Sequence, residues 1–594
     1  MPFFARNIRL PFRSFTRNAG GKRNFILLCS VVVGLLAGIS AVLLKKLVEA
    51  MEHLSRYIAE YISGSYIFLF LPALGILLTV VYIRYINRNK IEKGIGKILL
   101  NINRRQSVIK LNNLWSHMIS SSLTVGFGGS SGLEAPIVCM GAAVGSNTAK
   151  WLKFTVHERK ILLASGSAAG IAAVFNSPIA GVLFAFEVLL GETSIPAFIP
   201  LLAASASATI VSKLSYSGQL FHLAASDWKF SALPFYVLLG LGGGLLSCYI
   251  SYVARKLEHG IFASAPLLLR PLFGGAILGL MVFLFPPLLG EGYYYLQEVL
   301  SGHLQVLQQN NLFGAYMDQD WFIGLFILLI VLLKIVAAGI TIGSGGNGGT
   351  FAPTMFTGGF LGLLVAFLAN QTGWVQLSYS NFVAVGMAAV LSGVMHAPLT
   401  AIFLIAEISG GYALLIPLMI VSTCSYFMNK AFFHHNIYWH ELIKGKQVVV
   451  DKDKEILEEI SVKSLVNTNF EVIFGAQKMK DAIGRFAIKN ASILPVVDAE
   501  HQLIGVLVPD DMRRYLLEED LEGEVQDYMS DVPGLIDVND DSMESVMEQL
   551  DNLQVWTLPV VDEGRFIGFI SKSSVFSVYR KVLQRKQAQL DIFQ

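Results

Sequence analysis

Charged residues are scarce in this chain, and acidic residues are the scarcest. Asp, Glu, Lys and Arg make up 15% of the 594 residues, against about 25% in average soluble proteins. Residues 1–450 contain only 16 acidic and 30 basic residues, whereas residues 451–594 contain 27 and 15. The overall net charge of +2 therefore conceals a basic, charge-poor body and an acidic tail. This distribution excludes a single soluble globule, and the scattered basic residues argue against nucleic-acid binding.

Cysteine is rare as well, and no catalytic or metal-binding pattern stands out. The four cysteines lie in apolar segments without metal-ligand spacing, so we interpret them as small buried residues; they are Cys29, Cys139, Cys248 and Cys424. The eleven histidines form no HExxH motif, and no Gly-x-Ser-x-Gly elbow lies between a strand and a helix. We predict neither a metal site nor an enzyme. A membrane receptor or enzyme with a catalytic tail is the remote alternative.

The first 450 residues contain, instead, a series of apolar stretches. Several approach the ~20 residues needed to cross a bilayer; they lie near 25–45, 66–84, 196–212, 233–253, 271–290, 321–343, 380–394 and 413–428. Others, at 137–147, 160–174 and 178–190, are shorter and interrupted by Gly, Ser or Pro. Such segments indicate broken helices that line a substrate path, with closely packed buried helices as the alternative. The pattern predicts a mainly α-helical, polytopic membrane protein.

Basic residues before the first apolar stretch indicate its orientation. No acidic residue occurs before Glu49, whereas six basic residues precede residue 25: Arg6, Arg9, Arg13, Arg17, Lys22 and Arg23. Because basic flanks stay on the cytoplasmic side, we predict a multi-pass protein of the cell (plasma or inner) membrane with both termini in the cytoplasm. The long apolar run lacks a small-residue cleavage pattern, which argues against a cleaved signal peptide.

Two sequence motifs recur at nearly the same offset. GSSGLEAP at residues 129–136 resembles GGNGGTFAP at 345–353, and NSPIAGVLFAFE at 176–187 resembles HAPLTAIFLIAE at 396–407. The prolines of the first pair and those of the second pair are separated by nearly equal lengths of chain. We interpret the two pairs as an internal duplication. Inverted repeats are a common architecture of transporters.

Glycine-rich turns that lead into a proline point to anion binding when they lie inside a membrane. A helix that begins there has unsatisfied N–H groups and the positive end of its dipole. Glycine lets the backbone approach an ion closely, and proline suits the first turn because it has no N–H to leave unpaired. Two such starts that meet would bind an anion with partial charges. Tight helix packing is the alternative interpretation.

These motifs resemble those of the CLC chloride channel and transporter family. Gly132-Leu-Glu-Ala-Pro136 is similar to the family's gating-glutamate motif, usually GREGP, and Gly349-Thr-Phe-Ala-Pro353 is similar to its GxFxP motif. The resemblance covers roughly residues 25–445. It implies two related, inverted helical repeats, transport of chloride or a similar small anion across the lipid bilayer, and a homodimer with one pore per subunit.

The resemblance implies roles for individual residues. Glu134 would be the gate, since its carboxylate mimics a permeant anion and leaves when it is protonated. The anion would be bound by backbone groups and one tyrosine hydroxyl, at Gly132, Leu133, Thr350, Phe351 and Tyr438. For Tyr438 an interfacial aromatic anchor is the alternative. Three further intramembrane charges are interpreted as structural ties: Glu187, Glu407 and Lys334.

Two departures from the family pattern bear on selectivity and mechanism. The inner-gate motif, usually GSGIP, best matches residues 92–97, where Lys93 or, in a shifted reading, Ile95 replaces the serine. Lys93 would either add a full charge to the anion site or flank the membrane as a cytoplasmic cation. Family antiporters carry a proton-transferring glutamate where this chain has Val188, and valine cannot relay a proton. We predict passive, channel-like conduction, with a Cl⁻/H⁺ antiporter that uses a rerouted proton path as the alternative.

The acidic tail contains a second, shorter repeat. LPVVD occurs at residues 494–498 and again at 558–562, each time followed by a turn, another apolar run and a helical pattern. Two strand–turn–strand–helix units predict an α/β pair, which resembles the tandem CBS (Bateman) module of some CLC proteins. The predicted order is a basic segment 1–24, a transport domain 25–445, a linker 446–460, and CBS domains at 461–520 and 521–594.

The resemblance to CBS pairs also raises adenine nucleotide as a ligand. Such pairs often use a Ser or Thr and an Asp after the last strand. Here the first copy has Asp511 but Val508, and the second has Ser571 but Ser574. Each half is incomplete, and the acidic tail opposes a polyanion. We therefore favour a dimer-contact domain over a nucleotide site, and we predict no other cofactor.

Overall fold

The structure is a computed structural model. It describes residues 19–61, 67, 69–104, 106–191, 195–215, 227–257, 266, 268–308, 311–317, 319–444, 457, 460–489, 493–517, 523–539, 541–562 and 564–591. Four basic residues of the predicted N-terminal segment, Arg6, Arg9, Arg13 and Arg17, lie outside these ranges, as does most of the predicted linker. The chain divides into two compact units, Met1–Val448 and Val449–Gln594.

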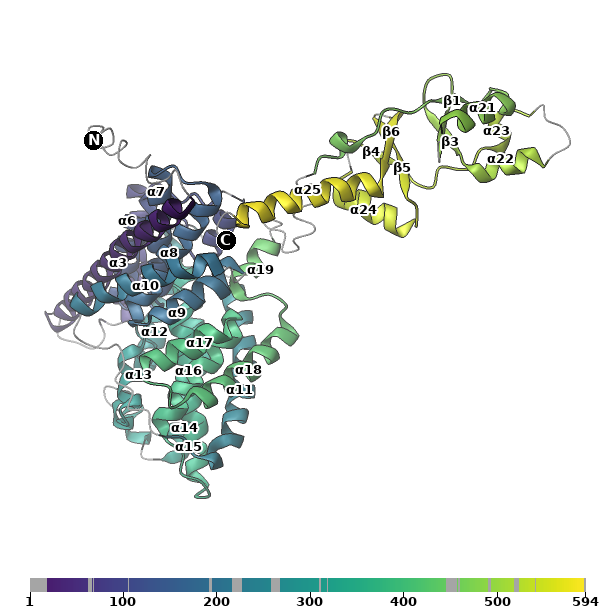
Figure 1. The fold of residues 1–594 in the computed structure, drawn as a ribbon. Helices are drawn as coiled ribbons and strands as arrows, with labels where there is room; N and C mark the ends of the chain where they lie inside the picture. Colours follow the sequence, from purple (N-terminus) through teal and green to yellow (C-terminus); the bar gives the residue numbers. More distant parts are fainter. Residues whose placement is uncertain are drawn as a thin grey trace, which may run out of the picture. The chain divides into compact units, whose positions relative to one another are not determined.

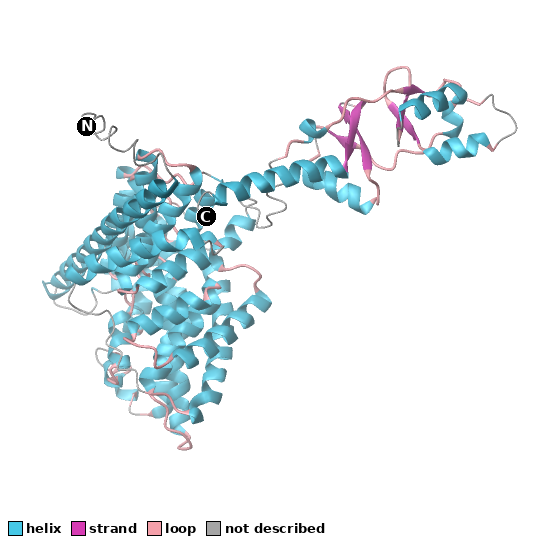
Figure 2. Ribbon diagram, viewed as in Figure 1, coloured by secondary structure: helices cyan, strands magenta, loops and turns pink. Residues whose placement is uncertain are grey.

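The first unit is built of helices (Figures 1 and 2). Its first half contains α3 (Ala19–Tyr61), α4 (Leu71–Val81), the π-helical turn η2 (Tyr82–Ile86), α5 (Ile95–Arg104), α6 (Asn112–Gly126), α7 (Glu134–Trp151), α8 (Val156–Phe175), α9 (Pro178–Phe184), the π-helical turn η3 (Ala185–Leu190) and α10 (Ile195–Ser215). Its second half contains α11 (Leu233–Lys256), α12 (Leu269–Leu284), α13 (Tyr293–Leu300), α14 (Asp320–Gly343), α15 (Phe351–Gln371), α16 (Tyr379–Met395), α17 (Pro398–Ile408), α18 (Leu415–Phe432) and α19 (Ile437–Lys444). The described connections of this half include the short 3₁₀ turns η4 (Phe230–Ala232), η6 (Pro286–Leu288), η7 (Leu304–Leu307) and η8 (Gly314–Tyr316).

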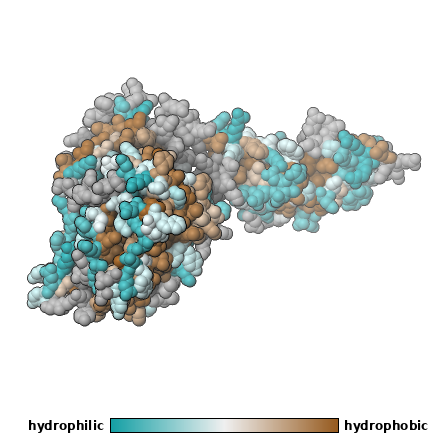
Figure 3. All heavy atoms as spheres, turned by 90° about the horizontal axis from the view of Figure 1, so that it is seen from below, coloured by the Kyte–Doolittle hydropathy of each residue, from teal (hydrophilic) through white to brown (hydrophobic). Residues whose placement is uncertain are grey.

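The polytopic membrane character predicted from the sequence is confirmed. In the described part of the chain, 6 helices are long and apolar enough to cross a membrane: Lys22–Tyr61, Ala197–Ser215, Phe230–Lys256, Asp320–Gly343, Phe351–Gln371 and Leu415–Trp439. Shorter apolar helices lie between them, as a fold with broken helices requires. Apolar side chains also spread over the surface of this unit (Figure 3), which suits contact with lipid.

The duplication appears again in the packing of the helices. α7 packs along α8, and α15 packs along α16. Gly141 and Gly145 bring α7 against α8, and the glycines at matching positions of the second repeat, Gly358 and Gly362, bring α15 against α16. A side chain at any of these positions would collide with the backbone of the neighbouring helix. Small residues here let the helices approach closely, so the repeat includes the packing surfaces as well as the motifs.

The helix ends follow from local sequence and repeat as well. Thr155 and Glu158 form a capping box at the start of α8, and Ser378 accepts from the third residue of α16. Both helices end at a left-handed residue, Asn176 and His396, each with a φ of 54°. A proline then begins the next helix, α9 or α17, since proline suits the first helical turn.

The second unit contains the strands of the described chain, in two small sheets (Figure 2). The first sheet has the strands β1 (Ile473–Phe474), β2 (Leu494–Val497) and β3 (Leu503–Leu507), and its helices are α21 (Met479–Lys489), α22 (Pro509–Leu516) and α23 (Val525–Tyr528), which packs against α22 and β3. The second sheet has the strands β4 (Ile536–Asp537), β5 (Thr557–Asp562) and β6 (Arg565–Ser571), with the helices α24 (Met543–Asn552) and α25 (Lys572–Asp591), and the 3₁₀ turn η9 (Val462–Leu465) contributes Val462 to its core. In each sheet the first strand runs parallel to the second, and the second runs antiparallel to the third. The predicted strand–turn–strand–helix repeat is therefore confirmed.

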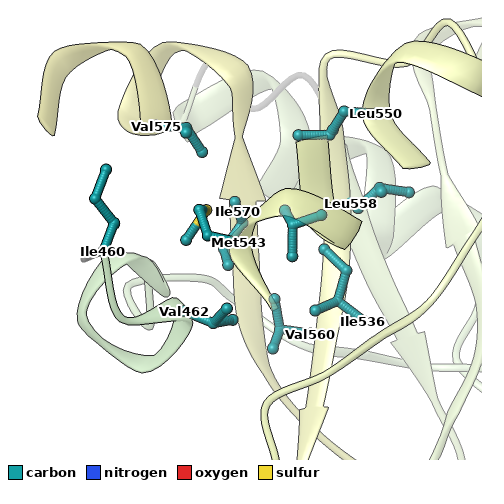
Figure 4. Close-up of a cluster of buried hydrophobic side chains, with 10 residues drawn as sticks. Ile460, Val462, Ile536, Met543, Leu550, Leu558, Val560, Ile570 and Val575 are labelled. Carbon is teal, nitrogen blue, oxygen red and sulfur yellow. The ribbon is translucent and has the colours of Figure 1, made fainter. Parts of the chain in front are cut away.

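Each half of this unit has its own apolar core. In the second half, Leu558 and Val560 of β5 and Ile570 of β6 face helix α24, which contributes Met543 and Leu550 (Figure 4). These side chains are buried, and a half-buried sheet covered by helices is the expected layer arrangement of an α/β unit. The first half repeats the pattern, since its core contains Leu494 and Val496 of β2 and Leu507 of β3.

Candidate anion site

The two glycine-rich turns of the repeat meet in the structure. The Gly132 N–H donates to the Gly349 carbonyl at 2.9 Å, and the Gly349 N–H donates to the Gly132 carbonyl at 2.8 Å. These bonds form an isolated antiparallel bridge. α7 begins two residues after the first glycine and α15 two residues after the second. The N-terminal ends of α7 and α15 therefore meet at this bridge, as the motifs predict.

Neither of these helix starts is capped by its own side chain. Leu133 and Thr350, the residues just before α7 and α15, make no side-chain cap hydrogen bond. A helix has no internal acceptor for its first N–H groups, so the two ends together favour an anion between them. Phe351, the first residue of α15, is fully buried, and its ring stacks on Phe175 with the ring centroids 5.6 Å apart. Aromatic side chains therefore pack at the start of α15.

Glu134, the first residue of α7, extends its carboxylate into this place. The residue is fully buried, and its Oε1 accepts a hydrogen bond from the Tyr293 hydroxyl. Its Oε2 lies against Gly132, where a Cβ would collide with it. That same Cβ position is 3.0 Å from the backbone nitrogen of Ala352 in α15. The carboxylate therefore lies between the two helix starts, where an anion would be held.

Glu291 and Tyr293 were not predicted from the sequence. Glu291 lies just before α13, and Tyr293 is the first residue of that helix. The Glu291 carboxylate accepts the Leu133 N–H at 3.0 Å, while Tyr293 bonds to Glu134. Two residues of one segment thus hold two successive residues at the start of α7. A lone acid at the end of an apolar stretch, in a body with few acids, was the available signal.

Lys334, predicted to be a structural tie, holds that same segment. It lies on α14 and is fully buried. Its ammonium donates to the carbonyls of Leu288 at 3.1 Å and Gly290 at 2.8 Å, and it lies 4.8 Å from the centre of the Phe356 ring. Gly292 has a φ of +83°, and a Cβ there would meet the same ring. The segment that carries Glu291 and Tyr293 is therefore tied to α14 and packed against α15.

Lys93 lies beside the turn that leads into α15. Its ammonium donates to the carbonyls of Gly345 at 2.8 Å and Gly346 at 3.0 Å. The next residue along, Asn347, donates to the Ser120 hydroxyl of α6 at 2.6 Å. The lysine charge is thus bound to the glycine-rich turn of the second repeat, just before α15 begins. Its role as an anion ligand stays a prediction.

Tyr438 is the second residue of α19, and its side chain is half-buried. α19 packs against α5, and the Tyr438 carbonyl lies 3.3 Å from the position of a Cβ on Gly96. The start of α5 therefore brings Tyr438 near the segment that carries Lys93. The role of its hydroxyl as an anion ligand stays a prediction.

Known proteins share this arrangement of helices. A family model described as voltage gated chloride channel matches residues 74–430. The chain belongs to this family. Two matches to the CBS domain, at residues 462–518 and 525–581, confirm the tandem module in the tail.

Relatives of this chloride channel family member include bacterial and plant proteins. It is 28% identical over 393 residues to a ClcB-like chloride channel protein of Ralstonia nicotianae, with 64% of this chain and 86% of the relative covered. It is 25% identical over 551 residues to chloride channel protein CLC-e of Arabidopsis thaliana, with 82% and 75% covered. The solved structure of a slow cyanobacterial Cl⁻/H⁺ antiporter has a TM-score of 0.61 at 22% identity and covers 71% of this chain and 97% of its own. The last comparison shows that the fold is shared.

Two further carboxylates cap helices of the opposite repeat. Glu187 accepts the N–H groups of Leu399 at 3.0 Å and Thr400 at 2.7 Å, at the start of α17. Glu407 accepts the N–H groups of Ile179 at 3.1 Å and Ala180 at 2.9 Å, at the start of α9. Four helices thus begin in the glycine- and proline-marked segments, and two of them are capped reciprocally. The other two, α7 and α15, direct their ends toward the site around Glu134.

Val188 lies in η3 and is fully buried. The carboxylate of its neighbour Glu187 accepts a hydrogen bond from the start of α17. A family antiporter's inner glutamate would stand at the position of this valine, according to the sequence motif. The side chain offers no group that could accept or donate a proton.

In the CBS unit, both residues considered for nucleotide binding have protein partners. Asp511 is fully buried; it accepts the Val508 N–H at 2.9 Å and the Ser530 hydroxyl at 2.8 Å. The Ser571 hydroxyl accepts the Ser574 N–H at 3.2 Å, at the start of α25. Both side chains therefore stabilise helix starts. No group of three or more His, Cys, Asp or Glu in the described ranges could hold a metal ion.

Proposed function

We propose that this chain conducts chloride or a similar small anion through a path gated by Glu134. The observation that carries the proposal is the Glu134 carboxylate between two helix starts, neither of which is capped by the side chain of its own N-cap residue. An anion and this carboxylate favour the same partial charges, so they compete for one place. Protonation removes the competing charge, and the side chain can then leave. The family membership supports transport, and we expect no enzymatic activity.

We propose, further, that conduction is passive. The support is Val188, a buried apolar side chain at the position of the inner proton acid. The neighbouring Glu187 does not take over the role of the missing acid, because its carboxylate accepts hydrogen bonds from the N–H groups of Leu399 and Thr400. The alternative is an antiporter whose protons travel by another path, and the cyanobacterial structure shows that this fold also serves a Cl⁻/H⁺ antiporter.

Reversal potentials of the full-length protein in a planar lipid bilayer distinguish the two mechanisms. With a chloride gradient alone, the current is expected to reverse at the chloride equilibrium potential. With a pH gradient alone, the reversal potential of a passive pathway stays at zero, because protons carry no obligatory share of the current. A shift under the pH gradient alone would establish coupling and overturn the passive mechanism. Replacing chloride by nitrate or fluoride on one side gives the anion preference.

We also propose a homodimer with both termini in the cytoplasm, as the family resemblance and the basic flank imply. Light scattering of the detergent-purified protein is expected to give a protein mass twice the 65.0 kDa of one chain. A mass of one chain at micromolar concentration would contradict the dimer. Protease added to inside-out vesicles is expected to remove the CBS unit, while right-side-out vesicles protect it.

A further inference from the structure

A cavity of about 850 Å³ reaches from the surface of the helical unit to the start of α7. Arg56, one of its lining residues, has 65% of its side chain exposed, whereas Leu133, another, is 4% exposed. One face of α3 contributes four charged residues to the lining, at intervals that place them on the same side of a helix: Lys45, Glu49, Glu52 and Arg56. The cavity is therefore a charged approach to the anion site.

Glu291 stands at the buried end of this cavity. Both Glu291 and Leu133 line the cavity, and the carboxylate accepts the Leu133 N–H. Glu134 is fully buried and does not line it. An anion that arrives through the cavity therefore meets the Leu133 N–H first, and it finds a carboxylate already bound there.

The surrounding structure holds Glu291 in this position. Lys334 donates to the carbonyl of Gly290, the residue before Glu291. Tyr293, two residues after Glu291, donates its hydroxyl to Glu134. The two carboxylates thus occupy successive positions along one approach, with Glu291 on the cavity side.

We propose that Glu291 is a second carboxylate gate, which competes with arriving anions for the Leu133 N–H and releases that N–H when it is protonated. The inference rests on the proposed function. A carboxylate and chloride accept from the same donor, so loss of the Glu291 charge favours the anion. Glu134 then controls passage, while Glu291 controls how readily an anion binds at the entrance.

Several other charged or titratable groups line this cavity or lie close to Glu291. They are Lys45, Glu49, Glu52 and Arg56 on α3, Glu134 on α7, Tyr293, Tyr294 and Tyr295 on α13, and Lys334 on α14. Of the carboxylates in this set, Glu291 is the one hydrogen-bonded to Leu133. A test must therefore distinguish the loss of this hydrogen bond from the loss of a negative charge in the cavity.

The test measures the half-saturating chloride concentration in a planar bilayer, with pH changed on one side at a time. The background is Glu134→Gln, which removes the titration of the first gate. On the cavity side, acidification from about pH 7.5 to about pH 4.5 is expected to lower the half-saturating concentration roughly tenfold, as loss of one charged competitor implies. From the other side no change is expected. In Glu134→Gln/Glu291→Gln the effect should vanish.

Glu134→Gln/Glu52→Gln is the matched control, because it removes a carboxylate from the same cavity that does not bind Leu133. It is expected to keep the pH effect. A half-saturating concentration independent of pH in Glu134→Gln, or a pH effect that survives Glu291→Gln, would overturn the inference. If Glu291→Gln does not fold, Glu291→Asp moves the carboxylate away from the Leu133 N–H. It is expected to weaken the pH effect on the half-saturating chloride concentration, and an unchanged pH effect would count against the proposal. Absence of any chloride current in the unaltered protein would instead refute the proposed function.

Discussion

Glu134→Gln is expected to conduct anions at neutral pH and to lose the pH dependence of its maximal flux. Glutamine keeps the size of the side chain and can still accept from Tyr293, but it carries no charge to compete with chloride. At saturating chloride, flux through the unaltered protein should rise about tenfold or more between about pH 7.5 and about pH 4.5, where carboxyl groups titrate. The variant should stay constant within about twofold, as measured by chloride efflux from liposomes at a fixed membrane potential.

Two matched variants identify the cause of this change. Glu52→Gln neutralises a carboxylate that lines the cavity from within α3 rather than from a helix start, and it is expected to keep the pH dependence. Tyr293→Phe leaves the Glu134 charge but removes its hydroxyl donor. A hydrogen bond to a charged group contributes about 1.5–3 kcal/mol, so this variant should have an intermediate flux at neutral pH. If Glu134→Gln retained the pH dependence of the unaltered protein, Glu134 would not be the gate.

The helix starts around Glu134 were predictable because local rules determine them. Glycine permits the close bridge between Gly132 and Gly349, and proline marks the first turn of each helix. The repeat then indicated that two such starts belong together. The same rules located α9 and α17, although no local pattern indicated that Glu187 and Glu407 would exchange caps between repeats. That exchange depends on contacts between parts of the chain that are far apart in sequence.

Glu291 could not be assigned a role in the same way. Its partner Leu133 lies in the other repeat, and Glu291 itself comes just after the apolar stretch that ends near residue 290, where no periodic pattern includes it. Its contact exists because Lys334 ties the preceding turn to α14. A tertiary contact of this kind leaves no local signal, apart from the rarity of acids in the body.

Hydropathy alone also overlooked a helix that supports the site. α6 contains Ser116, Ser120, Ser121, Ser122 and Thr124, which lower its apolar character, although all five are buried. Most of their hydroxyl groups bond to backbone carbonyls, and Ser120, Ser121 and Thr124 also bind Asn347 next to the second helix start. A polar helix buried inside a membrane protein resembles a loop in sequence, since its partners are supplied by the fold.

Gly132→Ala is expected to open the pathway by displacing Glu134 rather than by neutralising it. The new methyl group would occupy the space of the Glu134 carboxylate and lie 2.8 Å from the Ala352 Cβ. The carboxylate is the end of a flexible side chain, so it can move more cheaply than the backbone of α15. Overpacking costs about 1–3 kcal/mol, and one to two kcal/mol changes an occupancy about 5- to 30-fold. Chloride efflux at about pH 7.5 should therefore rise at least about fivefold, with a weaker pH dependence.

A double-mutant cycle separates this displacement from general damage to the helix start. In Glu134→Ala the side chain that obstructs the methyl group is gone, so adding Gly132→Ala should change the flux little. Gly242→Ala on α11 is the control for an added methyl group, because the nearest atom there is 4.0 Å away, and its flux should match that of the unaltered protein. Equal effects of Gly132→Ala with and without the Glu134 side chain would show that the substitution acts through α15. An effect confined to the protein with Glu134 would place the gate carboxylate against Gly132, between the two helix starts.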